Sequence, residues 1–282
     1  MSVPTSYKLA SGRSIPSMGL GTYLISPPDK VTYEALKAGF RLIDSAVMYH
    51  NEKGVGDGIA KWLQEDPENN RREDVVYATK LLDSQQGYET AKRSIDESLQ
   101  KVKAIGHIDL FLIHSPQTNR KLRLGTWQAL QEAVDEGKVK EIGVSNYGIH
   151  HLKELLEWEG LKYRPVVNQC ELSPWLQRND IAEFCRKEGI LMEGYSPLTQ
   201  GHKLNDRTLK ALAKKYNRDV GQILIRWSLQ KGYIPIPKTK TVSRLKSNLE
   251  VYDFELEKED FESLGDPNAY EVFDWDPTTY RG

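Results

Sequence analysis

Eight short apolar runs alternate with longer amphipathic segments along the 282-residue sequence. The longer segments repeat apolar residues at helical spacing, as at Ile95 and Leu99 and again at Leu209 and Leu212, which indicates helices with one buried face. Strand and helix patterns that alternate roughly every thirty residues, without a linker-like change in composition, favour a closed barrel over a doubly wound sheet. We therefore predict an α/β protein that is a single (β/α)8 TIM barrel, with one domain over residues 1–282. The predicted strands are MGLG (18–21), RLID (41–44), VVYATK (75–80), IDLFLIH (108–114), EIGVSN (141–146), VVNQC (166–170), ILMEGY (190–195) and YIPIPK (233–238).

A short segment before the first predicted strand has the pattern of a β-hairpin. In YKLASGRSIPSM (7–18), Ala-Ser-Gly separates two short alternating runs, and small residues with glycine are typical of a hairpin connection. We expect this N-terminal β-hairpin to cover the bottom of the barrel and to have a structural role.

The charge balance and the cysteine content exclude several classes of protein. Lysine and arginine together number 39, against 40 aspartates and glutamates, whereas nucleic-acid-binding domains usually carry a basic excess. Cys170 and Cys185 lie too far apart for a CxxC pair, and two cysteines are too few for a disulfide-stapled secreted domain. The sequence contains neither a signal-peptide pattern nor an apolar stretch of membrane-spanning length. We expect a cytoplasmic monomer with no nucleic-acid or membrane partner and, without an HExxH-like spacing, no metal site.

Polar residues follow most of the predicted strands at their C-terminal ends. In a parallel barrel these ends lie on one face, where barrel enzymes assemble their sites. Taken singly, each residue has a structural explanation, because an aspartate after a strand often caps a helix, a lysine is usually solvated and a histidine beside an apolar run is often a core residue. Their coincidence on one rim favours a catalytic site. The residues are Asp44, Lys80, His114, Ser145, Asn146, Asn168, Gln169 and Tyr195, with Tyr49 shortly after Asp44.

Asp44, Tyr49, Lys80 and His114 suit the catalytic chemistry of carbonyl reduction. An unperturbed phenol has a pKa of about 10 and is a weak acid near neutrality. A lysine cation about 4 Å away contributes roughly 4 kcal/mol at an effective dielectric constant of about 20, which would lower the phenol pKa by up to about three. Asp44 would keep Lys80 charged, and a neutral His114 would orient the substrate carbonyl. We therefore predict that Tyr49 donates a proton to the developing alkoxide.

Reduction requires an electron source, and other rim residues suit a nicotinamide nucleotide. The Tyr195 ring would stack on the nicotinamide, while Ser145, Asn146 and Gln169 offer hydrogen-bonding groups for its carboxamide. Barrel phosphate sites commonly follow strands seven and eight, and two cations there fit a 2'-phosphate, which favours NADPH/NADP over NADH/NAD. The predicted cofactor-binding set is completed by Gly21, Thr22, Ser196, Leu198, Lys238, Thr239, Arg244 and Asn248.

From GLGTY (19–23) to WDP (275–277), the chain resembles the aldo-keto reductase family, and in particular its short fungal members that reduce aldehydes, ketoacid derivatives and aldopentoses. This resemblance implies that the four catalytic candidates are the family's tetrad and that the carboxamide contacts and the Tyr195 stacking are shared. It also implies that Lys238, Thr239 and Arg244 bind the adenosine 2'-phosphate. The motifs that carry it are DSAVMYHNE, ATKL, DLFLIHSP, IGVSNY, NQCELSPWLQ, GYSPL and IPKTKTVSRLKSN, in the expected order.

Departures from the family pattern concern the substrate pocket. Tyr23 and Ser115 stand where many relatives have tryptophan, which predicts a wider pocket, and Trp275 is expected to line its mouth. The segment after Tyr195 is short, so we expect the cofactor to be less covered than in relatives with a long loop there.

The sequence thus predicts an NADP-dependent oxidoreductase that reduces small aldehydes, aldopentoses, α-dicarbonyls or ketoacid derivatives to alcohols. Two alternatives stay open. A barrel that binds NADP(H) without significant turnover would be a regulatory subunit, as some relatives are. A Schiff-base aldolase would use Lys80 as its nucleophile, although that interpretation leaves Tyr195, Lys238 and Arg244 without a joint purpose.

Overall fold

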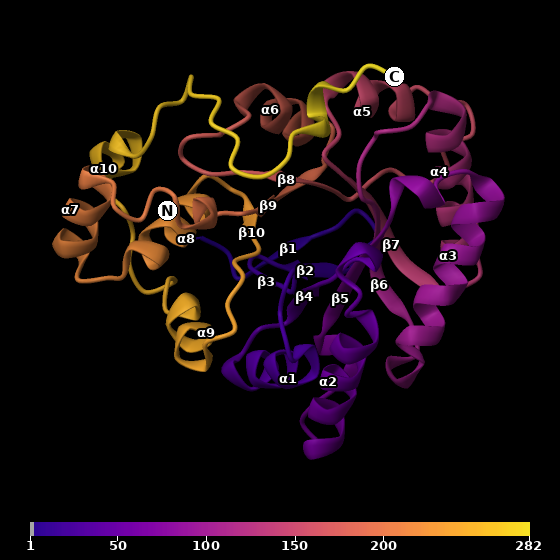
Figure 1. The fold of residues 1–282 in the computed structure, drawn as a ribbon, viewed down its shortest axis with the longest axis horizontal. Helices are drawn as coiled ribbons and strands as arrows, with labels where there is room; N and C mark the ends of the chain where they lie inside the picture. The colour runs from indigo at the N-terminus through magenta and orange to yellow at the C-terminus, as the bar shows by residue number, and fades with distance from the viewer. Residues whose placement is uncertain (1–2) are drawn as a thin grey trace.

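A computed structural model describes residues 3–282, which form a barrel of eight parallel strands (Figure 1). The strands follow one another in chain order around the barrel. Two backbone hydrogen bonds close the seam, from Gly19 N–H to the Pro235 carbonyl (3.0 Å) and from Gly21 N–H to the Pro237 carbonyl (3.1 Å). The predicted (β/α)8 barrel is confirmed, and each predicted run overlaps one strand. The strands are β3 (Leu20–Gly21), β4 (Leu42–Asp44), β5 (Val76–Leu81), β6 (Ile108–Ile113), β7 (Val139–Ser145), β8 (Val167–Glu171), β9 (Leu191–Tyr195) and β10 (Ile234–Pro235).

Helices surround the barrel and cover the outer face of the sheet (Figure 1). Two helices, α7 and α8, separate β9 from β10, and two more follow β10. The helices α1 and α2 pack closely because Gly58 has no side chain: a Cβ there would lie 2.5 Å from the Asp29 carbonyl oxygen. The helices are α1 (Pro28–Ala38), α2 (Glu52–Glu65), α3 (Tyr88–Lys101), α4 (Arg120–Asp135), α5 (Ile149–Leu156), α6 (Asn179–Lys187), α7 (Arg207–Tyr216), α8 (Val220–Gln230), α9 (Val242–Leu249) and α10 (Lys258–Ser263).

The apolar core has two parts, one between the sheet and the helices and one inside the barrel. The hairpin of β1 (Ser6–Lys8) and β2 (Ser14–Pro16) pairs Tyr7 with Ile15, and Leu9 and Ile15 belong to the cluster inside the barrel. Since these side chains pack on the strand interior away from the polar rim, the hairpin covers the bottom of the barrel, as predicted. The other members of the interior cluster are Leu42, Ala78, Leu110, Leu112, Val167, Ile234 and Ile236.

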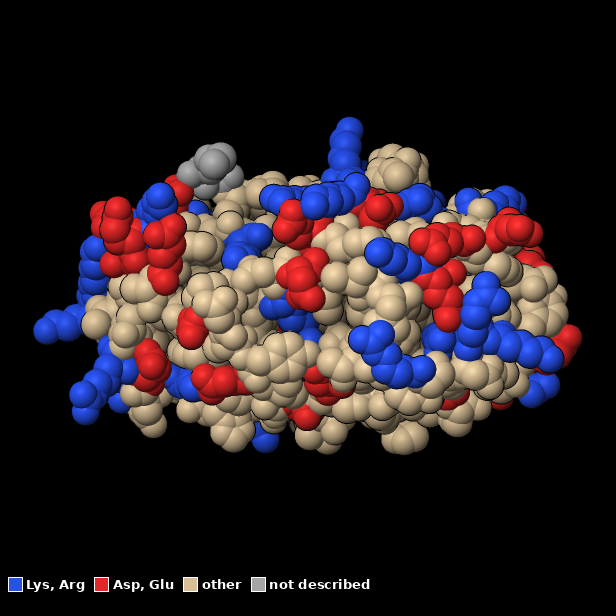
Figure 2. Space-filling view, turned by 90° about the horizontal axis from the view of Figure 1, so that it is seen from above, with Lys and Arg blue, Asp and Glu red and all other residues tan. Residues whose placement is uncertain are grey.

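The surface carries charged side chains of both signs, which are interspersed on the face shown in Figure 2. This distribution agrees with the near balance of acidic and basic residues in the sequence. No helix among residues 3–282 combines the length and the apolar character that a membrane span requires. Cys170 and Cys185 are buried free thiols.

Candidate active site

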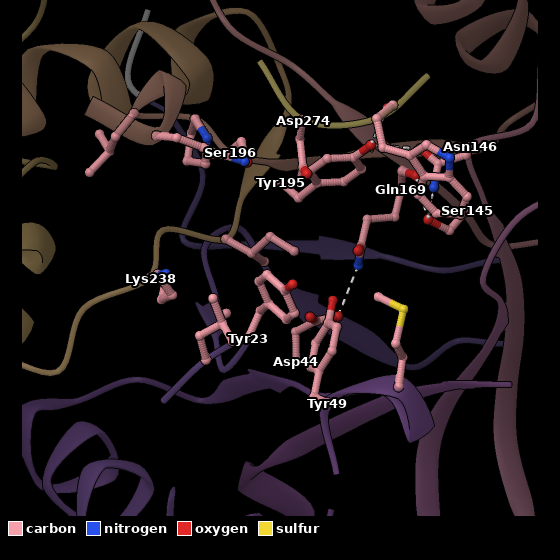
Figure 3. Close-up of a pocket in the computed structure, with 18 of the residues that line it drawn as sticks. Tyr23, Asp44, Tyr49, Ser145, Asn146, Gln169, Tyr195, Ser196, Lys238 and Asp274 are labelled. Carbon is pink, nitrogen blue, oxygen red and sulfur yellow. Dashed lines mark hydrogen bonds between the residues drawn. The ribbon is translucent and has the colours of Figure 1, made fainter. Parts of the chain in front are cut away.

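The C-terminal ends of the strands surround a cavity of about 660 Å³ (Figure 3). Most of the residues that the sequence singled out line it, although they come from all parts of the chain. Lys80 is fully buried directly behind the wall. The predicted residues in the lining are Gly21, Tyr23, Asp44, Tyr49, His114, Ser145, Asn146, Gln169, Tyr195, Ser196, Leu198, Lys238, Arg244 and Trp275.

Asp44 and Lys80 form a buried ion pair between the adjacent strands β4 and β5. The Lys80 ammonium lies 2.7 and 2.8 Å from the two carboxylate oxygens of Asp44, and it also donates to the Ser45 carbonyl oxygen at 2.8 Å. Burial alone would lower the pKa of Lys80, but Asp44 and Tyr49 more than offset this and raise it. The lysine is therefore a fixed cation at neutral pH.

Tyr49 ends a short 3-10 helix, η1 (Val47–Tyr49), that follows β4. Its hydroxyl oxygen accepts a hydrogen bond from Lys80 Nζ at 3.3 Å, so the predicted proximity of the two groups is present. The predicted net fall in the phenol pKa is wrong: burial raises the pKa of Tyr49 to about 12, although the Lys80 charge lowers it in part. The nearby cation favours the phenolate, but burial disfavours it by more, and the depth of burial cannot be read from the sequence. Tyr49 is thus protonated throughout the neutral range, as a proton donor must be.

His114 follows β6 and is enclosed at the centre of the rim. Burial, followed by the nearby Lys80 charge, lowers the pKa of its imidazole to about 3, so the ring is neutral as predicted. Its centroid lies 5.9 Å from the Tyr49 ring and 6.0 Å from the Trp275 ring. A carbonyl group bound between these rings would meet an uncharged imidazole beside the phenol.

Four polar residues at the ends of β7, β8 and β9 form one hydrogen-bonded wall. Ser145 Oγ donates to the Gln169 carbonyl oxygen (2.8 Å), and Asn146 Nδ2 donates to Ser145 Oγ and to the His114 carbonyl oxygen, both at 3.1 Å. The Tyr195 hydroxyl lies 2.9 Å from both Asn146 Oδ1 and the Trp275 carbonyl oxygen. These contacts fix the orientation of the side chains that were predicted to bind a carboxamide.

The opposite end of the cavity is cationic. Lys238 and Arg244 line it, both are exposed, and neither is paired with a carboxylate of the described chain. Ser196 and Lys238 lie far from Ser145 and Asn146 in Figure 3. Gly21 is part of the wall, where a Cβ would lie 3.0 Å from the Ile236 carbonyl oxygen. The cavity therefore joins an amide-rich end to an end suited to an anion.

Besides Lys80, four predicted site residues lie outside the cavity wall. Thr22 Oγ1 donates to the Asp44 carbonyl oxygen (2.8 Å), and Ser115 Oγ donates to Asp83 (2.6 Å). Thr239 Oγ1 accepts from the backbone N–H of Thr241 (3.1 Å). These hydroxyls are bound to neighbouring groups of the protein. The fourth residue, Asn248, is buried on α9.

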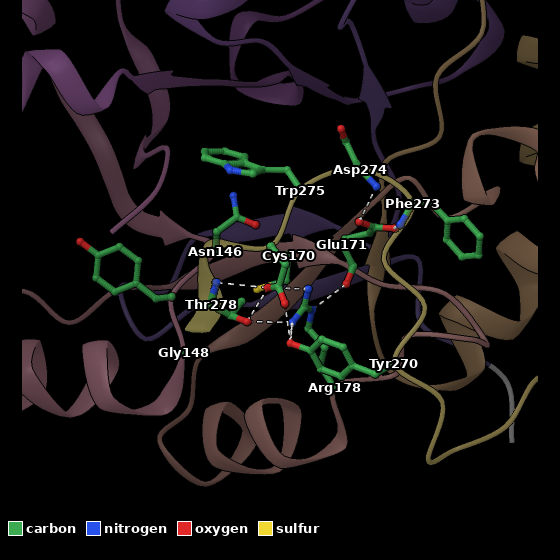
Figure 4. Close-up of polar contacts among 12 residues, drawn as sticks. Asn146, Gly148, Cys170, Glu171, Arg178, Tyr270, Phe273, Asp274, Trp275 and Thr278 are labelled. Atoms are coloured by element: carbon green, nitrogen blue, oxygen red, sulfur yellow. Dashed lines mark hydrogen bonds and ion pairs between the residues drawn. The ribbon is translucent and has the colours of Figure 1, made fainter. Parts of the chain in front are cut away.

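The C-terminal segment forms part of the cavity wall and is fastened by residues that sequence reasoning did not identify (Figure 4). The Glu171 carboxylate accepts the backbone N–H groups of Phe273 (2.8 Å) and Asp274 (3.1 Å), directly before Trp275. Arg178 donates to Thr278 Oγ1 at 2.8 Å and pairs with Asp276 at 3.0 Å. No local sequence pattern marks these contacts, because their partners are about a hundred residues apart in the chain.

Glu193 is a further site residue that was not predicted from the sequence. It lies on β9 and its carboxylate accepts from Gln169 Nε2 at 2.8 Å. The available signal was an acidic residue inside the apolar run ILMEGY, at a position where strand alternation directs the side chain into the barrel.

Comparison with known proteins decides the family. Residues 29–267 match the family model described as "Aldo/keto reductase family". The chain belongs to the aldo/keto reductase family. This aldo/keto reductase is 53% identical to an uncharacterized oxidoreductase of Saccharomyces cerevisiae, over 98% of this chain and 99% of the relative. It is 36% identical to the glyoxal reductase of Bacillus subtilis, over 93% of this chain and 92% of the relative.

Solved structures agree with this assignment. An aldo/keto reductase from Brucella melitensis superposes with a TM-score of 0.85 at 40% identity, covering 93% of this chain and 98% of that chain. The Bombyx mori aldo-keto reductase in complex with NADP gives a TM-score of 0.84 at 32% identity, covering 94% of this chain and 92% of that chain. The aldo/keto reductase described here is an oxidoreductase that acts on carbonyl or alcohol groups.

Proposed function

We propose that this aldo/keto reductase uses NADPH to reduce aldehydes and ketones to alcohols, with Tyr49 as the proton donor. The observation that carries the proposal is the position of the Lys80 ammonium between the Asp44 carboxylate and the Tyr49 hydroxyl, at 2.7 and 3.3 Å. A protonated phenol that faces a cavity and is backed by a fixed cation suits one step in particular. It can release a proton to an oxygen that is gaining negative charge.

The residues at the two ends of the cavity fit a nicotinamide nucleotide phosphorylated on its adenosine ribose. Ser145, Asn146 and Gln169 would hold the carboxamide, and the Tyr195 ring would support the nicotinamide. Lys238 and Arg244 offer two cations without carboxylate partners in the described chain, which suits a 2'-phosphate. When bound, NADPH would supply the hydride for reduction. The NADP in the related silkworm structure supports this choice of cofactor.

Side chains of the protein would then orient the carbonyl group and transfer the proton. The neutral His114 would orient the carbonyl oxygen toward the Tyr49 hydroxyl. Tyr49 would transfer its proton to that oxygen, and the Lys80 ammonium would stabilise the phenolate left behind. Asp44 would keep the ammonium in place. In the reverse direction, the phenolate would take the proton from an alcohol.

The mouth of the cavity combines aromatic and apolar side chains with one uncharged imidazole. Tyr23 and Met48 are about two-fifths exposed there (41% and 39%), and His114 and Trp275 complete the wall. We propose small aldehydes, aldopentoses, α-dicarbonyls and ketoacid derivatives as the substrate class. The Bacillus subtilis relative named glyoxal reductase favours the α-dicarbonyls among these.

The two alternative functions have less support. A Schiff base at Lys80 needs an accessible neutral amine, whereas this ammonium is fully buried, its pKa is raised and its contacts are Asp44, Ser45 and Tyr49. A barrel that binds NADP(H) without turnover would not need a proton donor oriented in this way.

The test is a substrate panel of pentoses, aromatic aldehydes, diketones and α-ketoesters, with NADPH and NADH in parallel. We expect NADPH oxidation with at least one of these classes. Tight NADPH binding without consumption of nucleotide in any reaction would instead favour the regulatory barrel. Borohydride trapping of a substrate on Lys80 would favour the aldolase.

A further inference from the structure

A buried carboxyl group lies directly behind the proposed carboxamide site. Glu193 is 1% exposed, and its Oε2 accepts from Gln169 Nε2 at 2.8 Å. Its Oε1 is buried and has no hydrogen-bond partner within residues 3–282. Glu193 therefore contacts the site through Gln169, and one of its two oxygens has no partner. The proposed proton transfer does not involve Glu193.

The amide of Gln169 is held by two carboxyl groups at once. Its Nε2 donates to Glu193 Oε2 at 2.8 Å and to Asp44 Oδ1 at 2.9 Å, the contact drawn between Gln169 and Asp44 in Figure 3. Those two oxygens accept hydrogen bonds, so the amide nitrogen must face them. The amide oxygen then points the other way, and Gln169 lines the cavity. An oxygen at that position accepts from the N–H groups of a carboxamide.

Glu193 forms no ion pair with a lysine or arginine among residues 3–282. The ionisable groups that act on it are Asp44 from β4 and Lys80 from β5, with Tyr49 beyond the lysine. Lys80 is already bonded to both carboxylate oxygens of Asp44. A second carboxylate would therefore add a net negative charge inside the barrel, which is costly. Burial, and next the Asp44 charge, raise the pKa of Glu193 to about 7.

We propose that Glu193 is a positioning residue which, together with Asp44, holds both amide hydrogens of Gln169 and so turns the Gln169 oxygen toward the cofactor carboxamide. In its protonated form Glu193 carries the proton on Oε1, the oxygen that has no partner among residues 3–282. Loss of that proton places a negative charge behind the nicotinamide site. The inference rests on the proposed binding of NADP(H) in this cavity.

The positioning role is tested by comparing Glu193→Leu with Glu193→Gln. The leucine variant removes an acceptor from Gln169, so the dissociation constant of NADPH, measured by quenching of protein fluorescence, should rise roughly three- to tenfold. The glutamine variant offers an amide oxygen to the same N–H and should recover most of the affinity. Wild-type affinity in the leucine variant, with a thermal melt that shows it folded, would overturn the positioning role.

The proton on Glu193 is tested by a readout that needs no cofactor. Infrared spectra of the nucleotide-free protein should contain a protonated-carboxyl band that disappears as the pH rises through about 7. The band should be missing from Glu193→Gln and present in Glu141→Gln. Glu141 is the matched control, because burial also raises the pKa of this carboxyl on β7, where it accepts from Ser11 of the loop between β1 and β2 at the bottom of the barrel. A band in Glu193→Gln that titrates as in the wild type would overturn the assignment.

The charge effect is tested with the two redox forms of the nucleotide. The oxidised ring is cationic, so the dissociation constant of NADP⁺ relative to that of NADPH should fall roughly three- to tenfold as Glu193 loses its proton. Both forms share the 2'-phosphate, so its own titration cancels in the ratio. The ratio should be independent of pH in Glu193→Gln and should follow the wild type in Glu141→Gln. If the ratio in Glu193→Gln depends on pH as it does in the wild type, the inference is contradicted. If the wild-type protein binds neither nucleotide, the proposed function is contradicted, and the infrared test of the Glu193 proton still applies.

Discussion

Lys80 Nζ donates to the Tyr49 hydroxyl oxygen at 3.3 Å while it is bonded to both carboxylate oxygens of Asp44. This contact does not outweigh burial, which raises the pKa of Tyr49 to about 12. The cation therefore matters most after proton transfer, when it lies beside the phenolate that Tyr49 has become. The phenol keeps its proton at neutral pH, and the phenolate that forms when the proton leaves is stabilised by the Lys80 ammonium.

Replacement of Tyr49 by Phe removes the proposed proton donor without removing its ring. We expect kcat for carbonyl reduction to fall by roughly 10²- to 10⁴-fold, which is the usual contribution of a positioned acid. NADPH affinity, measured by fluorescence quenching, should be nearly unchanged. Tyr163→Phe is the matched control, because that hydroxyl is bonded to Asp135 on the outside of the barrel. Retained turnover in Tyr49→Phe would disprove the assignment.

Replacement of Lys80 by Met should destabilise the fold, because it leaves the Asp44 charge buried without its cation. Breaking a buried pair in this way costs about 3–5 kcal/mol, measurable as the free energy of unfolding in urea. The double variant Asp44→Asn/Lys80→Met should be more stable than the sum of the single changes, since neither charge remains. Additive losses would show that the two groups are not coupled.

His114 should destabilise the protein in mild acid. Its pKa is about 3 in the folded chain and 6.5 in the reference state, so the unfolded chain binds the extra proton as the pH falls from about 6.5 toward about 3. Above pH 6.5 the group makes no such contribution. At pH 4.5 the penalty is about 2–3 kcal/mol, and His114→Asn should lose less stability than wild type between pH 7 and 4.5 by this amount. Equal losses in the two proteins would contradict a buried neutral imidazole.

Arg244 is expected to distinguish NADPH from NADH. Arg244→Gln should raise KM for NADPH about 10- to 100-fold, the range expected for losing a hydrogen bond to a charged group, and should leave KM for NADH almost unchanged. Lys246→Gln removes an exposed cation from the same helix, α9, outside the cavity wall. This control should have little effect on either cofactor. An equal rise for both cofactors in Arg244→Gln would rule out specific 2'-phosphate binding.

Glu171 should control the order of the C-terminal segment. Glu171→Gln weakens the acceptor of two backbone N–H groups, so the amides of Phe273 and Asp274 should exchange with solvent roughly tenfold faster. KM for the carbonyl substrate should rise because Trp275 follows directly, while NADPH affinity should change little. Glu271→Gln on the same segment breaks only the ion pair with Lys203 and serves as the control. If both variants exchange alike, the Glu171 contacts do not hold the segment.

The barrel and most of the rim were predictable because both follow from local periodicity. Once the runs ending at Asp44, His114 and Tyr195 are assigned to parallel strands, their ends must meet on one face. The direction of a short side chain was not predictable in this way. Thr22 and Ser115 stand at rim positions, yet their hydroxyls bond to Asp44 and Asp83, and only neighbours distant in the sequence decide that choice.

Two further parts of the site depend on long-range contacts and on burial. The protonation state of Glu193 cannot be predicted from its own position in the sequence, because it depends on Asp44 and Lys80 from other strands. The pKa of Tyr49 depends on burial and the Asp44 charge, which raise it, and on the Lys80 cation, which lowers it. The nearby cation could be predicted from the sequence, but the extent to which the Tyr49 side chain is buried could not.

The cavity wall around Trp275 is built by the last residues of the chain, whereas the proton donor and its cation sit on the barrel itself. This C-terminal segment is joined to the barrel through side-chain contacts such as those of Glu171 and Arg178, and it is not one of the paired strands. Natural variation and directed evolution can therefore change substrate selection through this C-terminal segment. The residues that transfer the proton lie on the barrel and are selected separately.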